Sequence, residues 1–152
     1  MKVRIVIADE REANFFEASK IDGPIAECGS LQNPVAGLKD TELESDRPGR
    51  RFGGGPPGTH HHDVAGERST ERHDLELFAK EVAKRIDAER VANAFDRLVI
   101  VAPPKMLGLI RRSLSTQSQA LLAGEVPKDI VHEGPEAIAR VVPREAFLQL
   151  QS

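Results

Sequence analysis

Residue types that suit phosphate binding are concentrated in one internal segment, residues 46–66. The planar guanidinium of arginine suits phosphate, and glycine lets a ligand approach the backbone closely. The segment shows no apolar periodicity, and long irregular loops in compact domains are usually functional or disordered. We therefore interpret it as a candidate binding loop. Its candidate residues are Arg47, Arg50, Arg51, Gly53, Gly54 and Gly55.

Three consecutive histidines follow in the same segment. Imidazole can bind zinc or nickel, and it can act as a general base near neutral pH. Consecutive residues of a coil point in different directions, however, and a structural metal site needs further ligands held from elsewhere. We predict no metal and no cofactor, and we keep His60, His61 and His62 only as catalytic candidates for a hydrolase.

Three further cations, Lys105, Arg111 and Arg112, surround a predicted helix and are candidate phosphate contacts. The glycine run itself does not form a P-loop, because Pro56 and Pro57 follow it and proline has no N–H to offer a phosphate. A surface of solvated charges balanced by nearby carboxylates is the simpler alternative.

Two other side chains with chemical potential are interpreted structurally. Asp9 follows the first predicted strand, but a nuclease with two metal ions needs several converging carboxylates, and Ala102 and Pro103 occupy the end of the fourth strand. We predict that Asp9 is a turn residue. Cys28 is the only cysteine, which excludes an intramolecular disulfide, and we expect a buried, inert thiol in a strand.

The elements that must position these residues follow from the apolar pattern. Three β-rich runs come first, a long loop at about 34–69 follows, and crossover units complete the chain. Thr70 is the predicted N-cap of a helix whose apolar residues recur at helical spacing. We expect an α/β fold with a mixed five-stranded sheet, like that of the ribonuclease-H class. Strands are predicted at 3–8, 13–18, 25–32, 97–102 and 119–126, and helices after 70, at 106–114 and at 135–142.

Composition limits the class of protein further. A chain of 152 residues with 39% hydrophobic and 30% charged residues fits one domain, 1–152. The net charge of −3 requires that any contact with nucleic acid use a local basic patch. We expect no membrane span and a cytoplasmic location, because no apolar run is long enough and the first apolar stretch is too short for a signal peptide.

Several segments together resemble a known family. They are Val6–Asp9, Ala13–Glu17, Asp46–Arg50, Phe78–Glu81 and Leu98–Gly108. Their order and spacing resemble the bacterial host attachment protein family, described as required for attachment to host cells. The resemblance extends over nearly the whole chain.

That family in turn is similar to the middle domain of archaeo-eukaryotic peptide-chain release factors, whose corresponding loop carries Gly-Gly-Gln. Here Pro56 follows the glycines, and no glutamine occurs between Gln32 and Gln117, so the hydrolytic role does not transfer. The resemblance implies a module that binds RNA or ribosomes, with tRNA as a possible ligand and host attachment as an indirect role. Two alternatives stay open: a protein-interaction module in attachment, and a hydrolase of peptidyl-tRNA or a related ester.

Overall fold

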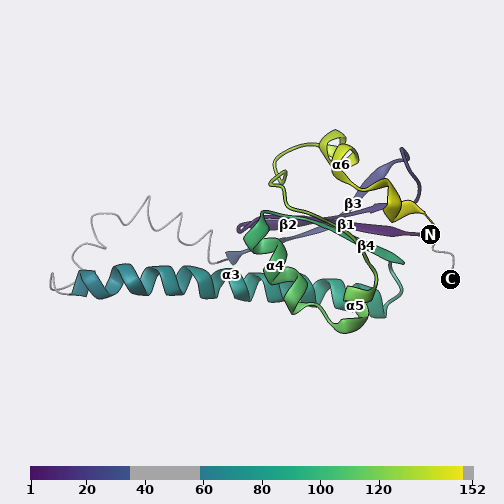
Figure 1. Ribbon diagram of the computed structural model, residues 1–152. Helices are drawn as coiled ribbons and strands as arrows, with labels where there is room; N and C mark the ends of the chain where they lie inside the picture. Colours follow the sequence, from purple (N-terminus) through teal and green to yellow (C-terminus); the bar gives the residue numbers. More distant parts are fainter. Residues whose placement is uncertain (35–58, 149–152) are drawn as a thin grey trace.

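A mixed five-stranded sheet forms the centre of the molecule (Figure 1). The computed structural model describes the backbone of residues 1–34 and 59–148, and the side chains of residues 1–34 and 72–148. The strands follow the order β3-β2-β1-β4-β5. Their bounds are β1 Val3–Ala8, β2 Glu12–Ala18, β3 Ile25–Gln32, β4 Arg97–Val101 and β5 Leu122–Val126.

The first three strands form an antiparallel meander, and the last two lie parallel to β1. In the register of the central pair, Val3 is the partner of Arg97 and Ile7 is the partner of Val101. Every residue of β1 and β4 is buried, as expected for β-branched strands covered on both faces. The predicted fold class is therefore confirmed.

Helices cover both faces of this sheet (Figure 1). The long α3 (Thr59–Val91), α4 (Pro104–Ser113) and the short α5 (Thr116–Ala120) lie on one face. Helix α6 (Pro135–Val141) and the 3-10 turn η1 (Arg144–Phe147) lie on the other.

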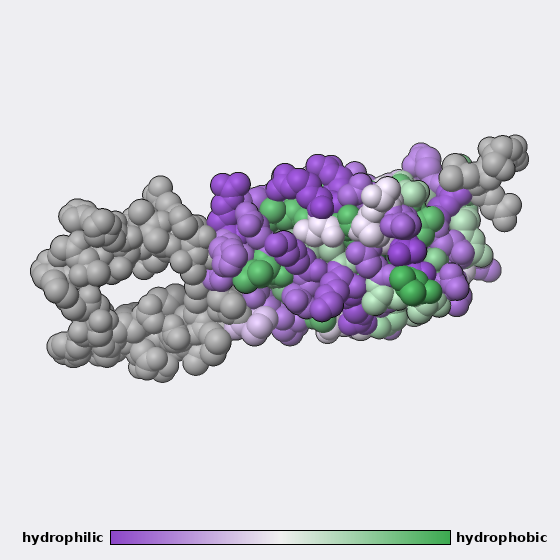
Figure 2. Space-filling model, turned by 90° about the horizontal axis from the view of Figure 1, so that it is seen from below, coloured by the Kyte–Doolittle hydropathy of each residue, from purple (hydrophilic) through white to green (hydrophobic). Residues whose placement is uncertain are grey.

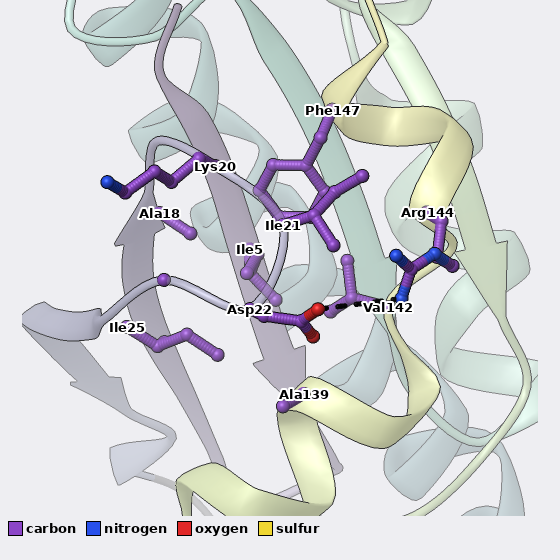
Figure 3. Close-up of a pocket in the computed structure, with 11 residues that line it drawn as sticks. Ile5, Ala18, Lys20, Ile21, Asp22, Ile25, Ala139, Val142, Arg144 and Phe147 are labelled. Atoms are coloured by element: carbon purple, nitrogen blue, oxygen red, sulfur yellow. Dashed lines mark ion pairs between the residues drawn. The ribbon is translucent and has the colours of Figure 1, made fainter.

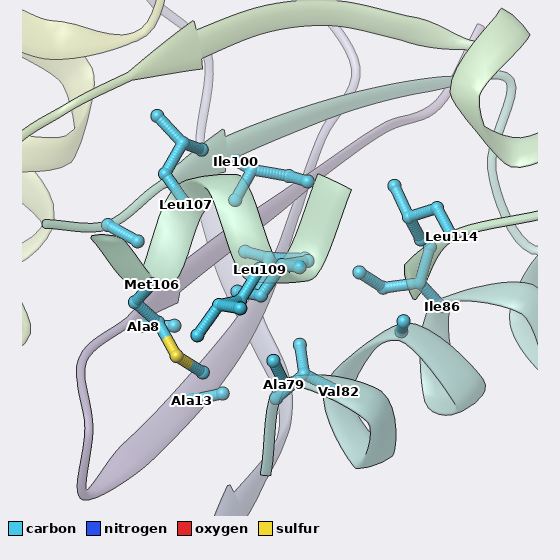
Figure 4. Close-up of a cluster of buried hydrophobic side chains, with 14 of the residues drawn as sticks. Ala8, Ala13, Ala79, Val82, Ile86, Ile100, Met106, Leu107, Leu109 and Leu114 are labelled. Atoms are coloured by element: carbon cyan, nitrogen blue, oxygen red, sulfur yellow. The ribbon is translucent and has the colours of Figure 1, made fainter. Parts of the chain in front are cut away.

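Two hydrophobic clusters hold the layers together. The first joins the sheet to α3 and α4, and it includes Ala13, Val82, Ile86, Ile100 and Leu109 (Figure 4). The second joins the opposite face to α6 and η1. Because side chains alternate between the faces of a strand, neighbouring residues of β1 contribute to different clusters.

Helix α3 begins at Thr59, so the predicted start after Thr70 is wrong. Residues 59–69 of the predicted loop are helical, and His60–His62 lie in the first turns of α3. Apolar periodicity reports which side of a helix is buried and not where its hydrogen-bonded turns begin. The first part of α3 lacks that periodicity, which explains the error.

The fifth strand is also shorter than predicted, because residues 119 and 120 belong to α5. The side chain of Ser115 caps α5 by accepting a hydrogen bond from the backbone N–H of Ser118. Asp87 on α3 holds this cap through the hydroxyl groups of both serines, the Ser115 Oγ lying 2.8 Å from its Oδ1. This capping network stabilises α5, so the strand begins at Leu122 rather than at residue 119.

Candidate nucleic-acid interface

Two of the predicted phosphate contacts share one side of α4. Lys105 and Arg112 are exposed, and they lie seven positions apart in the helix, about 10 Å along its axis. Gly108 lies between them, and a Cβ atom added there would meet nothing within 4 Å. The backbone at this point of α4 is therefore open to a ligand.

The third predicted contact, Arg111, is placed differently. Its Nη1 lies 2.8 Å from Oε1 of Glu125 on β5, in an ion pair whose members are both partly exposed. The structure therefore brings Lys105 and Arg112 to one side of α4 and holds Arg111 toward the sheet edge. Arg111 is already compensated by a carboxylate, which lowers its value as a phosphate ligand.

Two cations on α3 were missed by the sequence analysis. Lys80 and Lys84 are exposed, one helical turn apart, on the helix that packs beside α4. Their spacing, opposite the apolar positions of the same helix, was the signal that could have identified them. Within the described residues, Lys80, Lys84, Lys105 and Arg112 have no ion-pair partner, so four uncompensated charges lie on the two packed helices.

Seen from the side of α3 and α4, the surface is largely hydrophilic with separate apolar patches (Figure 2). The candidate loop residues Arg47, Arg50, Arg51 and the glycines 53–55 lie outside the described residues. The backbone of residues 60–62 is helical, while their side chains lie outside the described part. The catalytic interpretation of the three histidines therefore stays a prediction.

A buried charge cluster lies between α3 and the meander. Arg4 of β1 is buried, and its Nε donates to Oε1 of Glu89 at 2.7 Å. Arg85 donates to the other oxygen of Glu89 at 2.9 Å, and its guanidinium stacks over the Phe15 ring at 4.7 Å. Glu89 thus neutralises two guanidinium groups, so the charges of the cluster are balanced by its own residues.

Cys28 lies at the edge of this cluster, at a bulge of β3. Phe15 pairs with Gly29 and Phe16 with Glu27, so Cys28 is the extra residue. The Arg4 Nη1 lies 2.8 Å from its Sγ, and the thiol lies 3.3 Å from the carbonyl oxygen of Phe15.

The prediction that Cys28 is buried is wrong, because the bulge leaves the residue exposed. Partial desolvation of the thiol nevertheless raises its pKa, an effect larger than the lowering by Arg4. A raised pKa keeps the sulfur protonated, so the unreactive character expected from the sequence has a physical basis.

Asp9 acts in the turn between β1 and β2. Its Oδ1 accepts hydrogen bonds from the backbone N–H groups of Arg11 at 2.7 Å and Glu12 at 2.9 Å. The carboxylate thus takes the place of a backbone acceptor, as aspartate commonly does in turns. The predicted turn role is confirmed.

Two features are absent from the described residues. In this part of the chain, no group of three or more histidine, cysteine, aspartate or glutamate side chains is placed to hold a metal ion. None of its helices is both long enough and apolar enough to cross a membrane.

The sheet order and its helical layers define an α/β protein of mixed topology. A family model described as "Protein required for attachment to host cells" matches residues 4–142. The chain belongs to this host attachment family, as the sequence motifs predicted.

Two similar proteins give further context. An uncharacterized protein of Rickettsia prowazekii (strain Madrid E) is 33% identical over 66 residues, a match that covers 42% of this chain and 44% of that relative. Among solved structures, the archaeal translation termination factor aRF1 is similar with a TM-score of 0.49 at 10% identity. That similarity covers 96% of this chain and 36% of the factor, so the chain spans about a third of the factor's length.

Proposed function

We propose that this host-attachment-family protein binds RNA, as tRNA or within the ribosome, through the outer surface of α3 and α4. The observation that carries the proposal is the set of four exposed cations without carboxylate partners among the described residues. They are Lys80, Lys84, Lys105 and Arg112.

Physical reasons favour phosphate as the group recognised by this surface. Lysine and arginine that bind phosphates release condensed counterions, which supplies most of the affinity of sequence-independent binding. The protein carries a net charge of −3, so attraction must be local to this surface. Because Gly108 has no side chain between Lys105 and Arg112, a phosphate backbone can lie close to the helix at this point.

The candidate loop with Arg47, Arg50 and Arg51 is the second part of the proposed interface. In the sequence it lies between β3 and α3, so its arginines precede the helix that carries Lys80 and Lys84. Binding to the translation apparatus would place the protein in the cytoplasm and make attachment to host cells an indirect effect.

Charge reversal on α4 tests the proposal. The double variant Lys105→Glu/Arg112→Glu should bind tRNA at least about tenfold more weakly and should be lost from sedimenting ribosomes. The matched control is Lys20→Glu/Arg140→Glu, which changes the net charge equally at exposed positions away from α3 and α4. Equal loss in both double variants would mean that only net charge matters and would refute the interface.

The loop is tested separately by replacing Arg47, Arg50 and Arg51 with serine. Weaker tRNA binding with unchanged thermal stability is the expected result. If the unmodified protein neither sediments with ribosomes nor binds tRNA at low and moderate salt, the proposed function is wrong.

A protein-interaction role is the second candidate, favoured by two exposed apolar side chains on α3. Leu77 is 45% exposed and Val91 is 68% exposed. A protein partner would lose affinity in Leu77→Ser/Val91→Ser, whereas an RNA ligand would not. A pull-down from native lysate with Lys105→Glu/Arg112→Glu and with Leu77→Ser/Val91→Ser separates the two roles. Loss of RNA in the first variant supports RNA binding, and loss of a protein partner in the second supports a protein-interaction role.

A further inference from the structure

A small cavity lies on the face of the sheet opposite α3 and α4. It is bounded by β1, by the turn between β2 and β3, and by α6 and η1 (Figure 3). Its apolar lining includes Ile5, Ile25, Val142 and Phe147. The cavity volume is about 40 Å³, and a water molecule needs roughly 10–15 Å³ of such space. The cavity therefore has room for about three waters, or for a branched aliphatic group of similar size.

Opposite charges span one side of this cavity. Asp22 comes from the β2–β3 turn and Arg144 from η1, and the dashed line in Figure 3 joins them across the cavity lining. Lys20, the other charged residue of the lining, extends its ammonium group away from the cavity (Figure 3). The polar groups available to a ligand are thus one carboxylate and one guanidinium.

This pair is looser than the buried pairs of the same protein. Its Arg144 Nη1 and Asp22 Oδ2 atoms are 3.8 Å apart, and both side chains are mostly exposed. The Arg4–Glu89 and Arg85–Glu89 pairs have distances of 2.7 and 2.9 Å, typical of charge-assisted hydrogen bonds. Both groups of the looser pair therefore keep hydrogen-bonding capacity for a ligand.

The backbone fixes the position of the carboxylate. Asp22 has a φ of 60°, a left-handed conformation that aspartate and asparagine adopt more readily than most residues. The next residue, Gly23, donates its N–H to the Lys20 carbonyl oxygen at 3.0 Å and closes the turn. A tight turn thus holds the acidic group beside an apolar cavity.

We propose that this cavity binds a free α-amino acid with a small branched aliphatic side chain. The ligand's ammonium group pairs with Asp22, its carboxylate pairs with Arg144, and its side chain enters the cavity beside Ile5 and Val142. A zwitterion with an apolar substituent matches all three features, whereas a simple anion would leave Asp22 facing like charge. This site is independent of the proposed RNA interface, which lies on the other face of the sheet.

Isothermal titration calorimetry with L-leucine and L-valine tests the site. The comparison ligands are isocaproate, which lacks the ammonium group of leucine, and isoamylamine, which lacks the carboxylate. We expect leucine to bind at least about tenfold more tightly than either one. Equal affinity for isocaproate, or no detectable binding of leucine and valine up to about 10 mM, would overturn the proposal.

Two variants assign the charges. Asp22→Asn keeps the tolerance for the left-handed conformation and should weaken leucine at least about tenfold, whereas isocaproate should bind more tightly because the repulsive carboxylate is gone. Arg144→Gln should weaken leucine, whereas isoamylamine should bind more tightly because the repulsive guanidinium is gone. Arg140→Gln on α6, an exposed cation outside the cavity lining, is the matched control and should bind leucine normally. Unchanged leucine affinity in both Asp22→Asn and Arg144→Gln would refute the assignment, and circular dichroism confirms that each variant is folded.

Discussion

Arg4 is the one charged residue of the strand β1, and its burial is tolerated because Glu89 neutralises it. Removing one partner of a buried ion pair leaves the other charge uncompensated. We predict that Glu89→Gln lowers the free energy of unfolding by about 3 kcal/mol, since both Arg4 and Arg85 lose their carboxylate.

Urea denaturation measures this effect, with Glu17→Gln as the control. Glu17 also faces Arg4, at 3.6 Å, but its side chain is 35% exposed, so its loss should cost less than about 1 kcal/mol. Similar losses in the two variants would show that Glu89 has no special role.

Gly29 illustrates how one residue fixes a bulge. Its φ is +144°, and an added Cβ would lie 2.3 Å from the Nη2 atom of Arg85. We predict that Gly29→Ala destabilises the protein by about 1–3 kcal/mol, because the backbone conformation is strained for any side chain and Arg85 must move.

Gly108→Ala is the matched control in thermal denaturation. This glycine lies in α4 with open space around it, so alanine should stabilise the protein by about 0.5–1 kcal/mol. Opposite signs for the two substitutions are the expected outcome, and a stabilising Gly29→Ala would contradict the description of the bulge.

At the scale of elements, the extent of α3 is the feature most open to test. Gly66 lies inside the helix as the structure describes it, and glycine inside a helix costs about 0.5–1 kcal/mol relative to alanine. We therefore predict that Gly66→Ala raises the helical content in circular dichroism and slows amide exchange around residue 66.

Gly134→Ala supplies the comparison, because Gly134 is the N-cap of α6 and has an extended backbone. Alanine is a poor N-cap, so no gain of helix is expected there. If Gly66→Ala also gives no gain of helical content, α3 begins after residue 66.

At the scale of the whole molecule, the proposed RNA interface predicts a particular response to salt. The four cations of α3 and α4 alone would give a slope of about −3 to −4 for the logarithm of the affinity against the logarithm of the salt concentration, and contacts by Arg47, Arg50 and Arg51 would make the slope steeper by about 2 to 3. Lys105→Glu/Arg112→Glu should make that slope shallower by about 2, because two contacts are removed. Affinity measured from low to moderate salt gives both slopes, and identical slopes would exclude the two residues from the interface.

The amount of structure that could be predicted from the sequence depended on the type of signal. β-branched runs such as Val3–Ala8 predicted strands well, because burial on both faces demands them. The start of α3 left no apolar signal, and the charge cluster around Arg4 depends on contacts between residues distant in the sequence, such as Arg4 with Glu89.

The candidate site was predictable to a similar degree. Lys105 and Arg112 were identified by residue type alone, whereas the pairing of Arg111 with Glu125 required the parallel register of β5 beside β4. The Asp22–Arg144 pair was not predictable, since it joins a turn near the start of the chain to a turn near residue 144.

The parallel pairing of β1 with β4 has a consequence for synthesis on the ribosome. Val3 is made early, but its partner Arg97 follows 94 residues later (97 minus 3). The meander β1–β2–β3 is complete at Gln32, and Arg97 follows 65 residues later (97 minus 32), so at about 5–20 residues per second the meander waits roughly 3–13 seconds for its central neighbour. During that interval α3 is made and can cover one apolar face, but β4, α6 and η1 are still missing and the other face stays uncovered. A nascent chain of this protein is therefore a natural client for chaperones that shield hydrophobic surface.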